Sequence, residues 1–165
     1  MDLDRIDTET KVRYDVTPLF HDSAVFSELV EELAAPFVGK VDVVVGLEAL
    51  GFILGSAVAF RLDAGFAPIR KAGKLPVDES KKRTVSFTDY TKTEKSFEIR
   101  IDAIASDARV LIVDDWIETG EQVRAAIELV THAGASVEGV SVIGADRTPR
   151  TQDLFDRFDV HVLRS

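Results

Sequence analysis

The sequence contains no cysteine among its 165 residues, and it has a single methionine and a single tryptophan. The absence of cysteine excludes disulfide bonds, thiolate chemistry and zinc sites built from cysteine. Histidine is also scarce: His21, His132 and His161 lie far apart in the sequence and give no metal-ligand spacing. The longest stretch without a charged residue, 49–60, suits a buried helix and is too short to cross a bilayer.

Basic residues are outnumbered by acidic residues. Twenty Lys and Arg face 29 Asp and Glu, which gives a net charge of −9. This balance argues against a general nucleic-acid surface. A site for an anionic ligand must therefore be built locally, from backbone N–H groups and a few cations. The first ten residues are acidic and polar, so we expect neither a signal peptide nor a transit peptide, and we expect a cytoplasmic location without membrane contact.

Strand patterns alternate with helix patterns along the chain. Apolar runs rich in β-branched residues predict strands at residues 41–46, 65–70, 109–114, 137–145 and 160–163. Helices are predicted at residues 50–62 and 121–132. The alternation indicates an α/β fold, with a mainly parallel twisted sheet flanked by helices. No linker or repeat interrupts it, so we expect one domain over residues 1–165.

An amphipathic helix is predicted near the N-terminus. Ser23 is the expected N-cap residue, and one apolar face carries Phe26, Leu29, Val30 and Leu33. A proline and a glycine follow this pattern and are expected to end the helix.

A polar excursion at residues 71–95 interrupts the α/β pattern. Within and after it, residues 84–90 and 96–101 are able to pair as a hairpin. A long polar excursion in a compact domain is typical of a lid or a binding loop, and the alternative is a solvated loop without a role. We favour the lid, because the excursion begins directly after a predicted strand end, where open α/β sheets bind ligands.

The segment 110–122 is the most informative in the chain. A buried strand is followed by Asp114 and Asp115, and a Thr119-Gly120 turn then opens a helix. Carboxylates accept hydrogen bonds from ribose hydroxyls, and the unpaired N–H groups at a helix start bind phosphate. These residue types therefore predict a site for a ribose phosphate. Two alternatives stay open: an ordinary capping box of Thr119 with Gln122, and an acidic pair of a metal-dependent phosphotransfer domain.

Two further segments carry candidate anion sites. Residues 44–55 join a strand, a short turn and a glycine-bearing helix start, which suits an anion nest or, alternatively, tight packing of small residues. Arg70, Lys71 and Lys74 surround a glycine after a strand end and are suited to holding a pyrophosphate. The alternative for these cations is a solvated basic loop, but their position favours a site.

These segments, in this order, resemble the type I phosphoribosyltransferases, and among them most closely the members that use adenine. Residues 110–122 are similar to that family's motif for 5-phosphoribosyl-1-pyrophosphate (PRPP), and residues 46–52 to its pyrophosphate loop. Residues 65–76 are very similar to a stretch of the adenine enzymes, and residues 12–20 resemble the segment those enzymes fold over the base. Agreement of several motifs in order is more specific than any one of them.

The resemblance implies a fold, a homodimer and a set of roles. It implies the type I phosphoribosyltransferase fold, with a small N-terminal hood at residues 1–36 and a flexible lid at residues 71–95. The implied contacts with the ribose and the 5′-phosphate are Asp114, Asp115, Glu118, Thr119, Gly120, Glu121 and Gln122. The implied pyrophosphate contacts are Ala49, Leu50, Arg70, Lys71 and Lys74. The implied base contacts are Val12, Arg13, Tyr14 and Trp116.

The resemblance also implies the catalytic groups and the cofactor. The implied catalytic residues are Asp114, Asp115, Lys71 and, as the acid near the leaving group, Asp89. Mg²⁺ is the implied cofactor, and Asp114 and Asp115 would influence it indirectly, through PRPP. The expected partners are therefore PRPP and a nucleobase, with no nucleic acid.

Several residues depart from the family's pattern. Leu50 stands where the adenine enzymes have an arginine, and Arg13 stands where they have a phenylalanine. Glu121 and Gln122 replace the last two residues of the usual Thr-Gly-Gly-Thr turn. Two like charges ~4 Å apart repel by about 1 kcal/mol in water and about 4 kcal/mol at an effective dielectric constant of 20. Glu121 must therefore point away from any phosphate bound by this turn.

The predicted function is a phosphoribosyltransferase that moves the phosphoribosyl group of PRPP to a nucleobase, with a purine such as adenine expected, and releases pyrophosphate. One alternative is a non-catalytic sensor of the same fold that binds PRPP or a nucleotide, which Leu50 and Glu121 favour. A further alternative, a phosphotransfer domain that uses Asp114 or Asp115, leaves residues 70–76 unexplained.

Overall fold

A computed structural model describes residues 3–9, 14–88 and 93–164 of the chain. Its strands are β1 (Val43–Leu47), β2 (Gly65–Lys71), β3 (Lys82–Thr88), β4 (Glu94–Arg100), β5 (Arg109–Ile117), β6 (Ser136–Ala145) and β7 (Val160–Arg164). Its α-helices are α1 (Ser23–Ala34), α2 (Leu50–Leu62), α3 (Glu121–His132) and α4 (Gln152–Arg157), and short 3₁₀ turns occur at Leu3–Arg5, Thr17–Phe20, Ala35–Phe37 and Glu79–Lys81.

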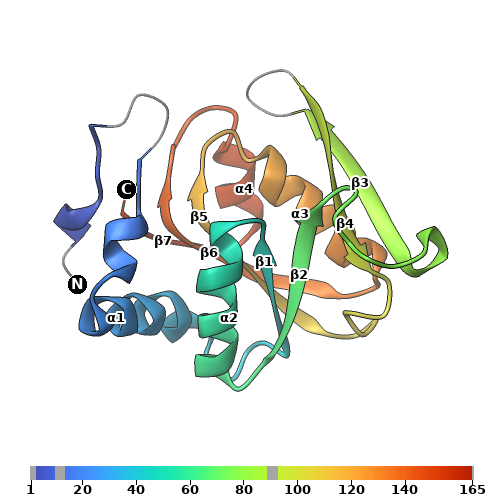
Figure 1. Cartoon of the computed structure of the whole chain (residues 1–165), viewed down its shortest axis with the longest axis horizontal. Helices are drawn as coiled ribbons and strands as arrows, with labels where there is room; N and C mark the ends of the chain where they lie inside the picture. The colour runs from blue at the N-terminus through green and yellow to red at the C-terminus, as the bar shows by residue number, and fades with distance from the viewer. Residues whose placement is uncertain (1–2, 10–13, 89–92, 165) are drawn as a thin grey trace.

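The described strands form one sheet in the order β3-β4-β2-β1-β5-β6-β7 (Figure 1). Strands β2, β1, β5, β6 and β7 are parallel to one another. Strands β3 and β4 form an antiparallel hairpin that joins the edge of β2. The predicted α/β class with a mainly parallel sheet and flanking helices is confirmed. The predicted bounds of α2 and α3 are also confirmed.

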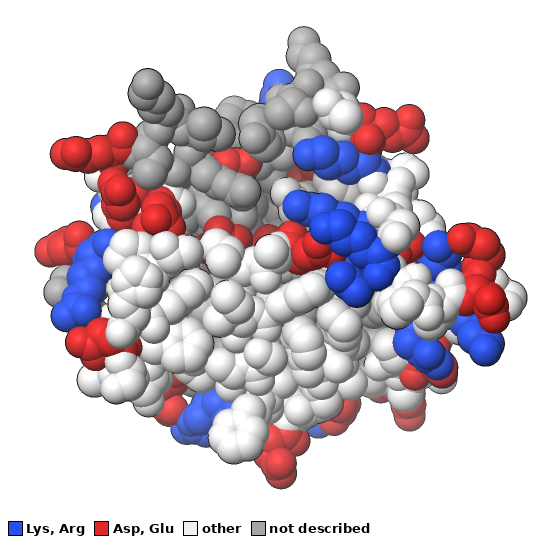
Figure 2. All heavy atoms as spheres, viewed as in Figure 1, with Lys and Arg blue, Asp and Glu red and all other residues white. Residues whose placement is uncertain are grey.

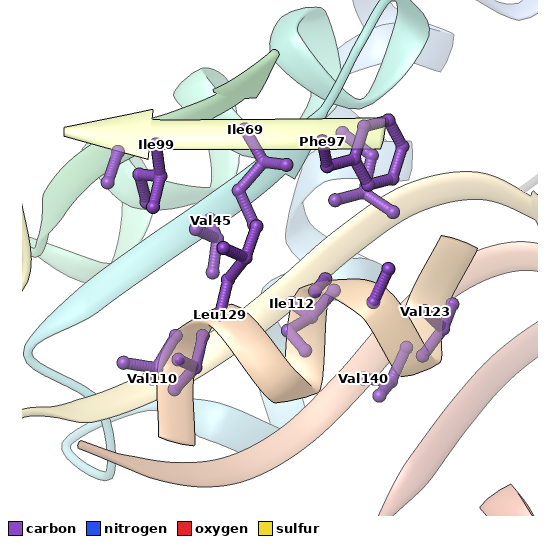
Figure 3. Packing of buried hydrophobic residues seen from close by; sticks show 14 of the residues in the cluster. Val45, Ile69, Phe97, Ile99, Val110, Ile112, Val123, Leu129 and Val140 are labelled. Carbon is purple, nitrogen blue, oxygen red and sulfur yellow. The ribbon is translucent and has the colours of Figure 1, made fainter. Parts of the chain in front are cut away.

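Apolar side chains fill both faces of the sheet. Successive residues of a strand point to opposite faces, so Val44 packs with α1 and α2 while Val45 packs with α3. Val45 belongs to a hydrophobic cluster between the sheet and α3. Figure 3 shows this cluster, and Ile112 of β5 and Leu129 of α3 both point into it. This double burial explains why the central strands consist of nearly continuous apolar runs.

The helix starts differ from two sequence expectations. The N-cap of α1 is Asp22 and not Ser23, because the Asp22 carboxylate accepts hydrogen bonds from the backbone N–H groups of Ala24 and Val25. The N-cap of α3 is Gly120, in the left-handed region at φ +81°, and not Thr119. The capping-box interpretation of Thr119 and Gln122 is therefore wrong.

Part of the polar excursion belongs to the sheet. Residues 82–88 form β3 and pair with β4, which confirms the predicted hairpin. Residues 89–92, including the candidate acid Asp89, lie outside the described residues, as do Val12 and Arg13. The sequence patterns missed α4, whose Leu154 is buried in the cluster under α3. Among the described residues, no helix combines the length and the apolar character needed to cross a membrane.

Candidate functional site

The carboxyl ends of β1 and β5 meet at one edge of the sheet, and the helices α2 and α3 begin there. The two strands are parallel neighbours, so both βα turns open on the same side. A cavity of about 150 Å³ lies between these turns. Its lining consists of residues 114–123 together with Glu48, Ala49, Leu50 and Lys71. The fold thus brings together three of the segments that the sequence analysis selected.

Two adjacent carboxylates form the floor of this cavity. Asp114 and Asp115 are 7% and 8% exposed, and both line the cavity. They lie inside β5, which extends to Ile117, and not at the strand end that the sequence suggested. A Cβ on Gly51 would come within 3.0 Å of Asp114 Oδ1 and 2.9 Å of the Val113 carbonyl oxygen. The start of α2 therefore packs directly on β5, beside the acidic pair.

Three glycines, one in β1 and two in α2, allow close contact between this strand and this helix. A Cβ on Gly46 would lie 2.2 Å from the carbonyl oxygen of Gly51. A Cβ on Gly55 would lie 3.0 Å from the Phe66 ring and 3.2 Å from the Cα of Gly46. The packing interpretation of this segment is therefore correct for these glycines. Glu48 and Ala49, which connect β1 to α2, line the cavity and are joined by a cis peptide bond.

The turn at residues 118–122 presents the start of α3 to the cavity. None of the side chains described caps this helix start, and Gly120 supplies the left-handed backbone that opens it. The first N–H groups of a helix lack partners within the helix and carry its positive dipole end. The carboxylate of Glu121 accepts a hydrogen bond from Arg124 Nη1 at 3.0 Å. The turn therefore suits an anion such as a phosphate group.

Residues 70–76, which we call the cationic loop, lie across from this turn. Glu48 holds the loop: its carboxylate lies 2.7 Å from Lys74 Nζ, accepts the backbone N–H of Lys71 at 3.1 Å, and lies 3.7 Å from Arg70 Nε. Burial raises the pKa of Glu48, but the hydrogen bonds from Lys74 and Lys71 outweigh it, so the net pKa is lowered. Lys71 lines the cavity, whereas Arg70 and Lys74 are outside its lining and pair with Glu48.

A second carboxylate holds the other end of the cationic loop. Glu98 of β4 is 1% exposed and accepts the backbone N–H groups of Lys74 at 2.9 Å and Leu75 at 2.5 Å. Lys82 Nζ lies 3.2 Å from its other oxygen. Burial raises the pKa of Glu98, yet the hydrogen bonds from the Leu75 backbone and from Lys82 lower it overall. Lys and Arg gather near the carboxyl end of β2 beside acidic side chains (Figure 2).

An aromatic pair closes one side of the site. The rings of Tyr14 and Trp116 meet edge to face, with centroids 4.8 Å apart. Trp116 Nε1 donates to Asp146 Oδ1 at 3.0 Å, and the guanidinium of Arg164 lies 5.8 Å from the Tyr14 ring centroid. A Cβ on Gly144 would lie 2.1 Å from the Trp116 ring. Two of the four predicted base contacts are therefore neighbours at the carboxyl edge of the sheet.

Sequence reasoning missed the residues that hold these groups in place. Glu48, Glu98 and Asp146 act on partners 16 to 30 positions away, so their roles depend on the fold. One signal was available for Glu98: it is a lone acid between two apolar residues of a predicted strand. A charge at such a position requires partners, and the cationic loop supplies them.

A buried acidic pair on a parallel sheet, an open helix start and a cationic loop define an α/β protein that binds phosphorylated sugars or nucleotides. The model of the phosphoribosyl transferase domain family matches residues 23–161, and the chain belongs to this family. An adenine phosphoribosyltransferase of Acidobacterium capsulatum is 42% identical over 130 residues, which are 78% of this chain and 69% of that protein.

Solved structures extend the likeness to the whole fold. The adenine phosphoribosyltransferase of Rhodothermus marinus superposes with a TM-score of 0.82 at 33% identity, covering 98% of this chain and 94% of that one. The enzyme of Saccharomyces cerevisiae, solved with an imino-altritol bisphosphate and adenine, gives a TM-score of 0.79 at 29% identity over 96% and 94% of the two chains. The fold is therefore that of the type I phosphoribosyltransferases.

Proposed function

We propose that this chain transfers the 5-phosphoribosyl group of PRPP to a nitrogen of adenine, forming adenosine 5′-monophosphate and pyrophosphate. The observation that carries the proposal is the shared cavity. It is lined by the acidic pair of β5, the open start of α3 and Lys71 of the cationic loop. These groups match the hydroxyls, the 5′-phosphate and the pyrophosphate of one substrate molecule. Family membership and the adenine phosphoribosyltransferases among the relatives support the same reaction.

Each part of PRPP has a candidate partner in this arrangement. The 5′-phosphate would accept hydrogen bonds from the backbone and hydroxyl groups of residues 118–122. Asp114 and Asp115 would accept hydrogen bonds from the ribose hydroxyls. The pyrophosphate would lie against Ala49, Leu50 and the cations of residues 70–74, with Lys71 nearest the cavity. The base would lie beside Tyr14 and Trp116.

The chemistry follows from where charge develops. The bond from C1 of the ribose to the pyrophosphate oxygen breaks, a nitrogen lone pair of the base forms the new bond to C1, and that base loses a proton. The sugar ring becomes cationic on the way, and the buried carboxylates of Asp114 and Asp115 favour that charge. Lys71 stabilises the departing anion. We also propose residues 71–95 as the lid that excludes water, which otherwise would hydrolyse PRPP.

Mg²⁺ is part of the proposal, and the residues present suit it as a metal bound through the substrate. The described residues contain no group of three or more His, Asp or Glu able to hold a metal ion. Mg²⁺ usually keeps several waters and is bound together with substrate phosphates, so PRPP itself would hold the ion, and Asp114 and Asp115 would influence it indirectly, through the ribose hydroxyls of PRPP. When bound, the ion neutralises charge on the leaving pyrophosphate.

We further propose that the chain acts as a homodimer in the cytoplasm. A face without charged side chains covers the front of the molecule over α2 (Figure 2). Ile53, Phe60 and Phe66 expose 46%, 91% and 37% of their surface, and such a patch is typical of a protein interface. A chain without cysteine has no need of an oxidising compartment. Phe60→Glu should lower the mass measured by light scattering to that of one chain, whereas the wild-type protein should have twice that mass.

Calorimetric titration with PRPP, with and without Mg²⁺, tests the proposed site. We expect micromolar binding that requires Mg²⁺, and a nucleotide product when adenine is added. The absence of PRPP binding would contradict the proposal. Binding without turnover in the presence of adenine would favour the sensor alternative, which no relative or structure named above supports.

A further inference from the structure

Glu121 poses a problem for the proposed phosphate site. It places a carboxylate in the first turn of α3, where the proposed 5′-phosphate would bind. We propose that Arg124 is the positioning residue that makes this turn able to bind a sugar phosphate: it draws the Glu121 carboxylate along the helix and fixes the backbone of the turn. The inference rests on the proposed function and adds to it a residue that the sequence analysis did not select.

One nitrogen of Arg124 makes both of these contacts. Nη1 donates to Glu121 Oε1 at 3.0 Å and to the backbone carbonyl oxygen of Thr119 at 3.1 Å. Glu121 and Arg124 are three positions apart on a helix, so their side chains meet on one face. The same guanidinium thus neutralises the Glu121 carboxylate and holds the backbone of Thr119 in the turn.

The rest of the guanidinium is anchored behind the turn. Arg124 Nε donates to Asp153 Oδ2 at 3.2 Å, and Nη2 donates to Asp153 Oδ1 at 2.5 Å. Nη2 also donates to the carbonyl oxygen of Arg150. Arg124 is 29% exposed, and the hydrogen bonds to Asp153 raise its pKa. The two-point contact with Asp153 fixes the plane of the guanidinium, as expected for an arginine–carboxylate pair.

Gly120 shows how closely Arg124 packs against the turn. Its φ of +81° is a conformation that other residues rarely adopt. A Cβ at Gly120 would also lie 2.9 Å from Arg124 Nη1 and 2.8 Å from Leu154 Cδ1. The guanidinium therefore occupies the space behind the glycine, and the turn, Arg124 and α4 form one packed unit.

Removal of the arginine would leave the Glu121 carboxylate without its cation beside the proposed phosphate. Arg124 carries one positive charge between Glu121 and Asp153, and in the Arg124→Ala variant the Glu121 side chain is free to approach the anion. Two like charges this close repel at a partly exposed site, more strongly than they would in water. We therefore expect Arg124→Ala to weaken ribose 5-phosphate binding by about tenfold, since tenfold corresponds to about 1.4 kcal/mol.

A double-mutant cycle with two ligands tests the proposal. Ribose 5-phosphate and pyrophosphate are titrated separately into the wild-type protein, Arg124→Ala, Glu121→Gln and the double variant. Arg124→Ala should weaken ribose 5-phosphate binding by about tenfold and leave pyrophosphate binding within about twofold, because pyrophosphate lies on the other turn. In the double variant, the loss of charge on Glu121 should restore most of the affinity. Added salt should reduce the difference in ribose 5-phosphate affinity between the wild-type protein and Arg124→Ala.

The control is Arg109→Ala, which breaks another two-point arginine–carboxylate pair, with Asp42, away from the site. It should change the affinity for neither ligand. If Arg124→Ala lowered the affinity for both ligands equally, or if Glu121→Gln did not restore ribose 5-phosphate affinity in the double variant, Arg124 would only support the fold. Either result would overturn the inference. Wild-type protein that binds neither ligand would instead overturn the proposed function itself.

Discussion

Gly144 controls the position of Trp116, and a single methyl group there tests the proposed base contact. Gly144 and Trp116 are paired across β5 and β6. A Cβ at Gly144 would lie 2.1, 2.3 and 2.5 Å from three atoms of the indole ring. Carbon atoms in contact are ~3.5–4.0 Å apart, so in Gly144→Ala the ring must move by about 1.5 Å. That movement strains the hydrogen bond from Trp116 to Asp146.

The expected effects on stability and on base binding follow from this displacement. Overpacking of a well-filled site costs ~1–3 kcal/mol, so the free energy of unfolding should fall by about that amount. Stacking of a base on an aromatic ring contributes ~1–3 kcal/mol, and a displaced ring loses part of it. We therefore expect KM for adenine to rise by about tenfold. KM for PRPP should stay within about twofold, because the phosphate and ribose contacts are elsewhere in the cavity.

Steady-state kinetics with each substrate varied in turn, together with urea unfolding, measure both effects. Gly65→Ala is the matched control, since a Cβ there meets its nearest atoms at an ordinary 3.6 Å. It should change neither KM value. In the double variant Gly144→Ala, Trp116→Leu, the smaller side chain should restore stability but not adenine binding. If folded Gly144→Ala bound adenine as tightly as the wild type, Trp116 would not be a base contact.

Three other predictions test the remaining parts of the site and fold. Asp114→Asn together with Asp115→Asn should abolish PRPP binding in calorimetry without unfolding the domain, and unchanged affinity in the folded variant would refute the ribose assignment. Glu98→Ala removes the buried acceptor of the Lys74 and Leu75 N–H groups in the cationic loop, so both stability and PRPP affinity should fall, and less so in Glu98→Gln. Hydrogen bonds from Arg109 lower the pKa of Asp42 to about 2, so this carboxylate contributes stability above its ordinary pKa near 3.8 that is lost as pH falls towards 2. Melting curves over that range should therefore decline less steeply for Asp42→Asn, and equal slopes would contradict the pairing.

The sequence was sufficient to predict the strands and helices whose structure depends on their own residue composition. The β-branched run before Gly46 and the uncharged stretch after it predict β1 and α2, because a strand and a helix buried in a parallel sheet require such composition. Acidic residues suggested that β5 stops at Asp114. The strand continues to Ile117 because β6 stays paired with it as far as Ala145, and the acidic pair lines a cavity instead of the apolar core.

Features that depend on tertiary contacts could not be predicted from local sequence patterns. The start of α3 depends on the left-handed backbone of Gly120, which packs against Arg124 and Leu154. The short helix α4 has few residues to form a pattern and is held by the burial of Leu154. The partners of Glu48 and Glu98 come from other strands and loops, so their roles emerge when the sheet assembles.

Pyrophosphate release on mixing the protein with PRPP, Mg²⁺ and adenine is the most direct test of the account. A coupled assay for pyrophosphate, with chromatography of the nucleotide product, should show one adenosine 5′-monophosphate formed for each pyrophosphate released, and no release without a base. The double Asn variant of the acidic pair should release none. A wild-type protein that binds PRPP but releases no pyrophosphate with adenine or any other nucleobase would contradict the proposal that this cavity is catalytic.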